Sequence, residues 1–344
     1  MRTRPTRWKT GLLLALLLAL LPAGAALAEG GPPMKRRLCV FDPAGKAGDY
    51  YRIAADYRAA AAAWGLDLEL LIRTEETLAT QELSSGRCDA ALMTGSRARR
   101  FNRFSGSVEA IGGLPNYEDL GELVKLLASP KAGEKLVDGK FQTVAIFPAG
   151  HLYLLFRDRE HATLATIAGK RIATLTYDDV SRKMVELIGA STVPAEVSTF
   201  SGIFNNGSAD ACYSPVTAIA PLELLRGVGK KGGILRVSLA QITLQIVART
   251  DVEWPADFPL SSRKYAAGAF EKTLRYPRKS EADLPAAAFI DATPETIAGY
   301  EDIFQRSRIA LRESGVYDPT MLRLLRRIRC KRDPRRAECA QKLE

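Results

Sequence analysis

Short apolar strands alternate with helical segments over most of this chain, and this alternation limits the possible folds more than any single motif. Extended runs are expected at 37–41, 67–73 and 89–93, with helices between them at 50–64, capped by Asp49, and at 75–84. Strands that alternate with crossover helices form mainly parallel sheets. The sequence therefore predicts an α/β protein whose first lobe closes with helices at 117–127 and 131–137.

The middle of the chain indicates a second lobe. Two longer runs, 142–147 and 152–157, are split by Pro148-Ala149-Gly150, and further strands are expected at 171–175, 196–199 and 209–213, with helices at 181–188 and 218–225. A β-rich stretch at 234–249 is long enough to return through a hinge, and helices follow at 262–274, 294–314 and 319–329. Two lobes joined by crossing strands form a clamshell. We assign residues 29–140 and 250–329 to lobe I, and 141–249 to lobe II with the hinge strands.

The first 28 residues have the pattern of a secretory signal peptide. A basic start is followed by a leucine-rich core, Leu12 to Leu21, and by the small-x-small site Ala26-Leu27-Ala28. The core is too short for a membrane span, which needs roughly 20 residues. We expect cleavage after Ala28 and a periplasmic mature protein, since no later stretch has the apolar length of a span.

Removal of this leader changes the charge balance. It carries four basic residues and no acidic ones, so the formal net charge falls from +10 to +6. The basic stretches at 97–103 and 323–336 lie in no recognisable nucleic-acid-binding module. A solvated surface or an acidic ligand fits this balance better than nucleic acid, and no nucleic-acid partner is expected.

Export places the five cysteines in an oxidising compartment. Cys330 and Cys339 bracket a short proline-containing loop, so a disulfide is expected to staple the tail at 330–344. Cys39 lies in the first expected strand and Cys88 just before the third, and the two can pair if those strands are neighbours in a parallel sheet. Cys212 is left over, and a small buried apolar residue is its simplest interpretation.

The loops after the strands are the expected ligand site, because strand carboxyl ends and helix N-termini converge on the crevice of an open α/β sheet. Some of the side chains have an equally simple structural explanation: Asp42 can bind a ligand or cap its loop, Arg97 can pair with a carboxylate or lie in solvent, and the aromatic rings can stack on a ligand or pack within their lobe. The candidates are Asp42, Thr94, Gly95, Ser96 and Arg97 from one lobe, and Tyr153, Tyr177, Asp178, Phe200 and Ser214 from the other.

The sequence gives little support for catalysis or for metal binding. His151 and His161 are the chain's two histidines, no G-x-S-x-G elbow is present, and the cysteines and histidines lack metal-ligand spacing. Asp178-Asp179 is a pair of carboxylates at a predicted loop, but adjacent residues need not face one another. We expect no catalytic residues, no metal and no cofactor.

Several longer motifs together resemble a known family. They are Cys39-Val40-Phe41-Asp42, Cys88 to Gly95 with Arg97, Ala149 to Leu154, Leu164 to Ile172, Phe204 to Ala211 and Gly315 to Pro319. Over nearly the whole mature chain they look like the periplasmic solute-binding proteins of tripartite ATP-independent periplasmic (TRAP) transporters, in an uncharacterised branch. The resemblance implies the type II periplasmic-binding-protein fold with a helical C-terminal region.

One position departs from that family. TRAP binders usually carry an arginine for the substrate carboxylate at the end of the strand after the Gly-Lys-type turn. Here the matching place holds Ala173, and Arg171 lies two residues earlier, which preserves the strand face. Arg171 or Arg97 is thus the candidate for holding a carboxylate.

The sequence as a whole predicts a monomeric periplasmic protein that captures a small solute between two lobes and delivers it to membrane permease subunits. An anion is one candidate ligand. Two alternatives stay open: an accessory or sensor protein that binds another protein, and an enzyme on the same fold. The ligand itself is not readable from the sequence.

Overall fold

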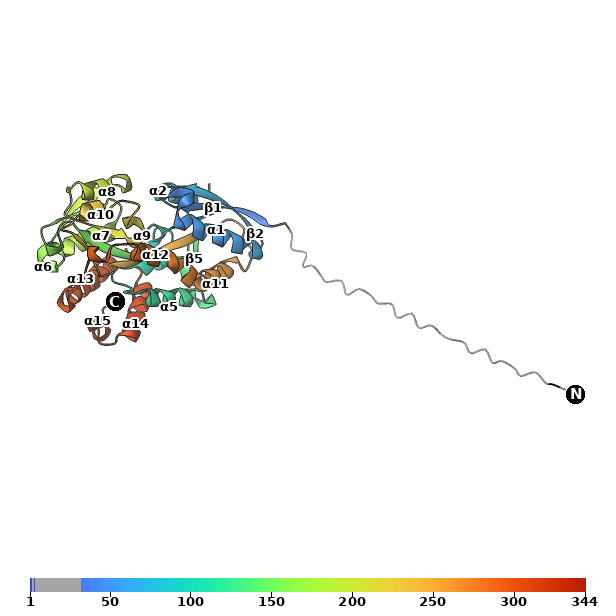
Figure 1. Ribbon diagram of the computed structural model, residues 1–344. Coiled ribbons are helices and arrows are strands. Elements are labelled where there is room, and N and C mark those ends of the chain that lie inside the picture. Colours follow the sequence, from blue (N-terminus) through green and yellow to red (C-terminus); the bar gives the residue numbers. More distant parts are fainter. Residues whose placement is uncertain (2, 4–31) are drawn as a thin grey trace. The chain divides into compact units, whose positions relative to one another are not determined.

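The computed structural model describes residues 1, 3 and 32–344. The predicted cleavage site, and the predicted signal peptide apart from residues 1 and 3, lie outside the described residues. The region Pro33–Glu344 forms one unit, and it consists of a mixed sheet with helices packed on it (Figure 1). Among the helices of residues 32–344, none combines the length and the apolar character that crossing a bilayer requires.

The strands form one sheet whose main path runs β2-β1-β3-β10-β5-β8-β6-β7. Their bounds are β1 Met34–Phe41, β2 Leu66–Arg73, β3 Ala90–Thr94, β4 Val137–Asp138, β5 Phe141–Phe156, β6 Arg171–Leu175, β7 Ser191–Ala195, β8 Ala211–Pro215, β9 Gly233–Leu235, β10 Ala240–Arg249 and β11 Phe289–Ile290. The pairs β1–β2, β1–β3, β6–β7 and β6–β8 are parallel. The central strands β10 and β5 pair antiparallel with each other and with β3 and β8. The sheet therefore has two parallel ends joined by two long crossing strands.

Helices flank this sheet along its length (Figure 1). The longer ones are α1 Asp49–Ala61, α2 Glu76–Ser84, α5 Tyr117–Leu127, α7 Asp179–Leu187, α8 Val197–Asn205, α11 Phe258–Gly268, α12 Phe270–Ala282, α13 Pro294–Glu313 and α14 Pro319–Arg332; the shorter ones are α3 Gly95–Ala98, α4 Arg103–Gly106, α6 Leu164–Ile167, α9 Val216–Ile219, α10 Leu225–Val228 and α15 Ala337–Gln341. Near the β1–β2 end, an aromatic core packs α1 and α11 against β5, with the Tyr57 and Phe147 ring centroids 6.2 Å apart.

Four local predictions were wrong, besides the helix expected at 218–225, which is interrupted by a turn at 220–224 between α9 and α10. Asp49 is the first residue of α1 and not its cap; Asp42 fills the related role, since its carboxylate accepts from the Tyr51 amide at 2.9 Å. Residues 131–137 form two 3-10 turns in place of a helix. The predicted strand at 196–199 is the start of α8, while the extended segment precedes it as β7.

The predicted break at Pro148 is the fourth. Strand β5 continues through it, because Pro148 faces Thr243 and Gly150 faces Ile242, so a bulge absorbs the extra residue between them.

Two disulfides close within the described chain. Cys39 and Cys88 are joined, as the parallel pairing of β1 with β3 allows, and Cys330 is joined to Cys339. Both predicted pairs are thus confirmed. Cys212 is free and fully buried in a hydrophobic cluster.

Candidate ligand-binding site

A cavity of about 140 Å³ lies where strands from both ends of the sheet finish. Thr94 at the end of β3, Leu175 at the end of β6 and Pro215 at the end of β8 all line it. Cavities of this volume take molecules about the size of benzene. The position agrees with the rule that ligands bind at the carboxyl ends of strands in open α/β sheets.

Aliphatic side chains form much of the wall. They come from the crossing strands, from α7 and from the loops between them: Ile111, Leu152, Leu175, Val180, Met184, Leu239, Ala240 and Ile242. Such a surface favours an apolar ligand body, since burying apolar area stabilises a complex by roughly 25 cal/mol per Å². The polar residues that also line the cavity therefore decide the orientation and charge preference of a ligand; they are Glu76, Thr94, Ser96, Arg99, Glu109, Tyr177, Asp178, Ser181 and Tyr213.

Four predicted site residues line this cavity. Thr94 and Ser96 join their hydroxyls at 2.9 Å. Tyr177 and Asp178 come from the opposite end of the sheet, in the loop between β6 and α7. Asp178 caps α7 by accepting from the Ser181 amide at 3.1 Å. The structure thus brings loops far apart in the sequence to one cavity.

Arg97 lies beside the cavity but its charge is already engaged. The guanidinium is buried, with its Nε 3.6 Å from Glu76 Oε2 and its Nη2 donating to Thr77 Oγ1 at 3.1 Å. Its Cζ lies 3.5 Å from the ring centroid of Tyr177. Burial, followed by the charge of Glu76, raises the pKa of the Tyr177 phenol. Arg97 therefore connects the two ends of the sheet and does not line the cavity.

The other predicted residues have local structural roles. Asp42 is buried and accepts from the Ala44 amide at 2.8 Å, so it holds its own loop. The Ser214 hydroxyl donates to the carbonyl of Pro215 at 3.0 Å. Gly95 is buried and donates its amide to Glu109 Oε1 at 2.9 Å. None of the three is among the residues that line the cavity.

Tyr153 and Phe200 are packed in the protein interior. Tyr153 donates its hydroxyl to Glu281, and its ring centroid lies 6.1 Å from that of Phe289. Phe200 packs edge-on against Tyr213 at 5.7 Å. Both rings pack within the core, which was the alternative to stacking on a ligand, and neither lines this cavity.

Arg171 lies far from the cavity. It is the first residue of β6, is exposed, and pairs with Asp210 at 2.8 Å. Leu175, at the other end of the strand, lines the cavity, and four residues at about 3.3 Å each separate them by about 13 Å. Arg171 therefore does not reach this cavity.

Arg99 is the arginine that lines the cavity, and the sequence analysis did not select it. Its Nε and Nη2 both point at the carbonyl of Gly106 from 3.4 Å, a long hydrogen bond, and its Cζ lies 5.1 Å from the centroid of the Tyr317 ring. Within the described residues, no carboxylate forms an ion pair with it. Arg99 belongs to the basic stretch 97–103, but only the fold shows which of those arginines faces the cavity.

Glu109 is a second residue that sequence reasoning missed. Its Oε1 accepts from the Thr243 amide and hydroxyl at 2.6 and 2.8 Å as well as from Gly95, whereas its buried Oε2 has no partner in the described chain. Burial raises the pKa of this carboxyl to about 7, although the bonds from Thr243 and the charge of Arg99 oppose the shift. Glu109 therefore exchanges a proton near neutral pH.

One group of side chains has the composition of a metal site. Cys39, Cys88 and Glu82 place their ligand atoms within 4.8 Å of one another. The two sulfurs are joined in a disulfide, so they offer no thiolate to a metal. We assign this group a structural role.

Comparisons with known proteins show the family of this chain. Residues 58–344 match the family model described as "Solute-binding protein AdeT 1/2". A probable solute-binding protein AdeT1 of Acinetobacter baumannii is 36% identical over 301 residues, which cover 88% of this chain and 99% of the relative.

Solved structures share the fold at low identity. A TRAP periplasmic solute-binding protein from Ralstonia eutropha with bound (S)-2-acetolactate has a TM-score of 0.69 at 14% identity, covering 86% of this chain and 99% of its own. One from Desulfovibrio salexigens with bound orotic acid has a TM-score of 0.69 at 11% identity and covers the same shares.

The fold and the cavity thus define a solute-binding protein of the two-lobe clamshell class. Within that class, the chain belongs to the AdeT 1/2 family of solute-binding proteins. The expected resemblance to TRAP binders is confirmed for the fold.

Proposed function

We propose that this protein captures a small carboxylate in the periplasm, with Arg99 as the anchor for the carboxylate group. The observation that carries the proposal is that Arg99 lines a cavity with aliphatic walls and that no carboxylate of the described chain lies within ion-pair distance of it. A guanidinium binds a carboxylate through two parallel N–H···O bonds. Ligands in the related TRAP structures, acetolactate and orotic acid, are small carboxylates and support this choice.

Closure would work by population shift. The cavity takes residues from loops at both ends of the sheet, so a ligand in it stabilises the form in which those loops are close. Lobe I at 29–140 and 250–329, and lobe II at 141–249, are the proposed moving bodies, with β5 and β10 as the hinge. The closed monomer would then dock on membrane permease subunits, after cleavage of the leader at Ala28.

The accessory-protein alternative requires a cleft filled by side chains. The cavity between the strand ends, with a volume of about 140 Å³, favours solute capture over that alternative. No observation favours an enzyme.

The test is a pair of matched probes. Isovalerate and isovaleramide have nearly the same shape, and isovalerate alone carries the charge. Thermal unfolding with each probe should show stabilisation by isovalerate or another small aliphatic carboxylate, reaching about 2.7 kcal/mol at 100 times its Kd. The amide should have little effect.

Variants of Arg99 then locate the contact. Replacing Arg99 by Met should weaken the Kd of the stabilising carboxylate by roughly 10- to 100-fold, because hydrogen bonds to charged groups contribute about 1.5–3 kcal/mol. Arg100→Met, at the exposed neighbour, is the matched control. Equal affinity in the Arg99→Met and Arg100→Met variants, or stabilisation of the wild type by the amide alone, would refute the proposed anchor.

A further inference from the structure

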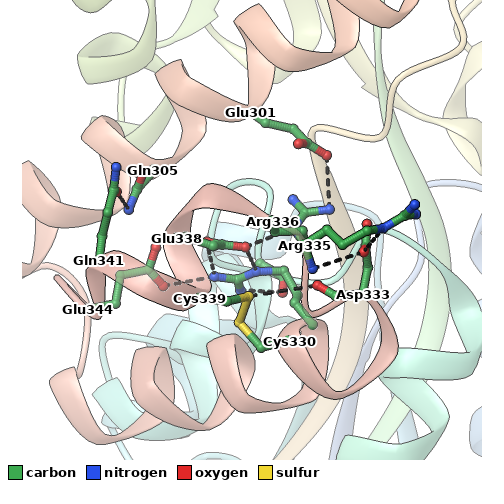
Figure 2. The surroundings of a disulfide bond; sticks show 12 residues. Glu301, Gln305, Cys330, Asp333, Arg335, Arg336, Glu338, Cys339, Gln341 and Glu344 are labelled. Carbon is green, nitrogen blue, oxygen red and sulfur yellow. Dashed lines mark hydrogen bonds and ion pairs between the residues drawn. A yellow bond between two sulfur atoms is a disulfide. The ribbon is translucent and has the colours of Figure 1, made fainter.

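The C-terminal segment contains a buried cluster of four charged side chains beside a disulfide. Figure 2 shows two of its members, Glu338 and Glu344, next to the disulfide. Arg308 of α13 pairs with Glu338 at 2.7 Å and with Glu344 at 2.6 Å. Arg329 of α14 pairs with the same two carboxylates at 2.6 and 2.9 Å. Both arginine side chains are at most 2% exposed. Their charges are balanced by Glu338, which lies within the loop closed by the Cys330–Cys339 disulfide, and by Glu344, which follows it.

Each of these arginines also holds a backbone carbonyl far away in the sequence. Arg308 Nη1 donates to the carbonyl of Ile111 at 2.8 Å, and Arg329 Nη1 donates to that of Gly113 at 2.7 Å. The loop 109–114, which we call the cavity wall loop, contributes Glu109 and Ile111 to the ligand cavity. The charged cluster therefore lies directly behind one wall of the ligand site.

The wall loop has other supports as well, since Gly95 and Thr243 donate to its Glu109. Its Ile111 amide donates to the Tyr317 hydroxyl at 3.1 Å, and its Gly112 amide donates to the carbonyl of Leu239 at 2.6 Å. Gly112 has a φ of +59°, and a Cβ there would lie 2.5 Å from the Phe304 ring. Phe304 is on α13, and Tyr317 lies between α13 and α14. The C-terminal helices and the turn between them therefore hold the Ile111 amide and the Ile111 and Gly113 carbonyls, whereas other segments hold Glu109 and Gly112.

The disulfide controls the carboxylates of the cluster. Glu338 precedes Cys339, so the bond to Cys330 keeps Glu338 against Arg329, while Arg336 holds Glu338 and Glu301 at 2.9 Å each (Figure 2). If the segment detached, the two guanidinium groups would be left buried without counter-charges, which is strongly destabilising. Relaxation of the arginines would release the Ile111 and Gly113 carbonyls.

We propose that Arg308 and Arg329 are positioning residues for the ligand cavity, and that the Cys330–Cys339 disulfide sets ligand affinity through them and the wall loop. The proposal rests on the proposed function for its link to a ligand. Its structural half, the control of the wall loop by the distant disulfide, can be measured without any ligand.

Hydrogen exchange of the wall loop is the first measurement. Cys330→Ser/Cys339→Ser should speed exchange of the Ile111 and Gly112 amides at least 10-fold in protein that far-UV circular dichroism shows to be folded. The control is Cys39→Ser/Cys88→Ser, which removes the disulfide between β1 and β3 and should leave that exchange unchanged. No change in the first variant, or equal acceleration in both, would overturn the proposal.

Arg308 provides an independent arm that keeps both disulfides. Arg308→Met should speed the same exchange, and Arg308→Lys should restore part of the protection because an ammonium can still bond a carbonyl or a carboxylate. If Arg308 only stabilised the whole protein, protection of the wall-loop amides would fall in proportion to global stability in both variants. Such a result, with no selective loss at the wall loop, would refute the positioning role of Arg308.

The ligand arm uses the carboxylate that stabilises the wild type. Its Kd should weaken at least 3-fold in Cys330→Ser/Cys339→Ser and stay the same in Cys39→Ser/Cys88→Ser. Faster exchange with an unchanged Kd would overturn the link to affinity. If no carboxylate stabilises the wild type, the proposed function fails, whereas the exchange result still decides whether the C-terminal segment positions the loop.

Discussion

Replacing Glu338 by Gln and comparing stability at neutral and acidic pH tests the electrostatics of the buried cluster. Burial by itself would raise the pKa of Glu338, but the hydrogen bonds and charge of Arg329, followed by the charges of Arg308 and Arg336, outweigh it and lower the pKa from 4.5 to about 2. The side chain is only 6% exposed, so solvent screens these interactions little. Glu338 should therefore contribute strongly to stability at neutral pH.

The size and sign of this contribution follow from proton linkage. A carboxyl with a lowered folded-state pKa adds stability that is present above its unfolded value of 4.5 and is lost as the pH falls through about 2. A shift of this size corresponds to about 3 kcal/mol at pH 7, since one pKa unit is 1.36 kcal/mol. Roughly 2 kcal/mol of that contribution is lost between pH 7 and pH 3.

Urea unfolding at pH 7 and pH 3 measures the effect. Glu338→Gln should lower the free energy of unfolding by about 3 kcal/mol at pH 7 and by about 1 kcal/mol at pH 3, because Gln does not titrate. Glu301→Gln is the control, since Glu301 pairs with Arg336 but is 38% exposed, and it should change stability by less than 1 kcal/mol. An equal loss at both pH values in Glu338→Gln would refute the linkage argument.

Three further predictions concern the cavity and the core. Tyr177→Leu removes the ring under Arg97 and should lower the free energy of unfolding by about 1 kcal/mol, whereas Tyr177→Phe should stay within 0.5 kcal/mol; equal losses in urea unfolding would argue against the cation–π contact. In Gly95→Ala the new Cβ would lie 2.5 Å from Glu109 Oε1, so we expect a loss of about 1–3 kcal/mol, while Gly268→Ala, with open space around it, should be neutral or stabilising. Burial raises the pKa of Cys212 well above its ordinary value, so Ellman's reagent should find no reactive thiol in the folded protein and one per chain in guanidinium; a fast reaction under native conditions would contradict this burial.

Local chemistry made several elements predictable. Helix α5 has the expected bounds, 117–127, because Asn116 caps it and its apolar residues recur with helical spacing. Strand β6 also lies at the expected residues. Predictions failed where a partner decided the outcome, as in β5, where the neighbouring strand β10 absorbs Pro148 through a bulge. Propensity describes a segment alone and cannot include such a partner.

The residues of the site also divide into those that the sequence predicted and those that it did not. Strand order and the rule for strand ends led to Thr94, Ser96, Tyr177 and Asp178, since those loops follow strands in any open α/β sheet. Arg99 and Glu109 were missed because each faces the cavity only through contacts with distant residues, Gly106 and Thr243 among them. Nothing near Arg97 in the sequence indicated that its guanidinium would pair with Glu76 and lie over the ring of Tyr177.

The sequence by itself determined the α/β class, the Cys330–Cys339 pairing and the family resemblance, because these depend on residue type, short-range order and spacing. The Cys39–Cys88 pairing also required β1 and β3 to be neighbours, which the tertiary structure decided. Only the tertiary structure decided which charged groups remain free and which are neutralised. Arg97, Arg308 and Arg329 form ion pairs with carboxylates from distant segments, whereas Arg99 forms no ion pair in the described chain. The reason is physical: a buried charge is stable only with a partner within a few ångströms, and the fold alone sets those distances.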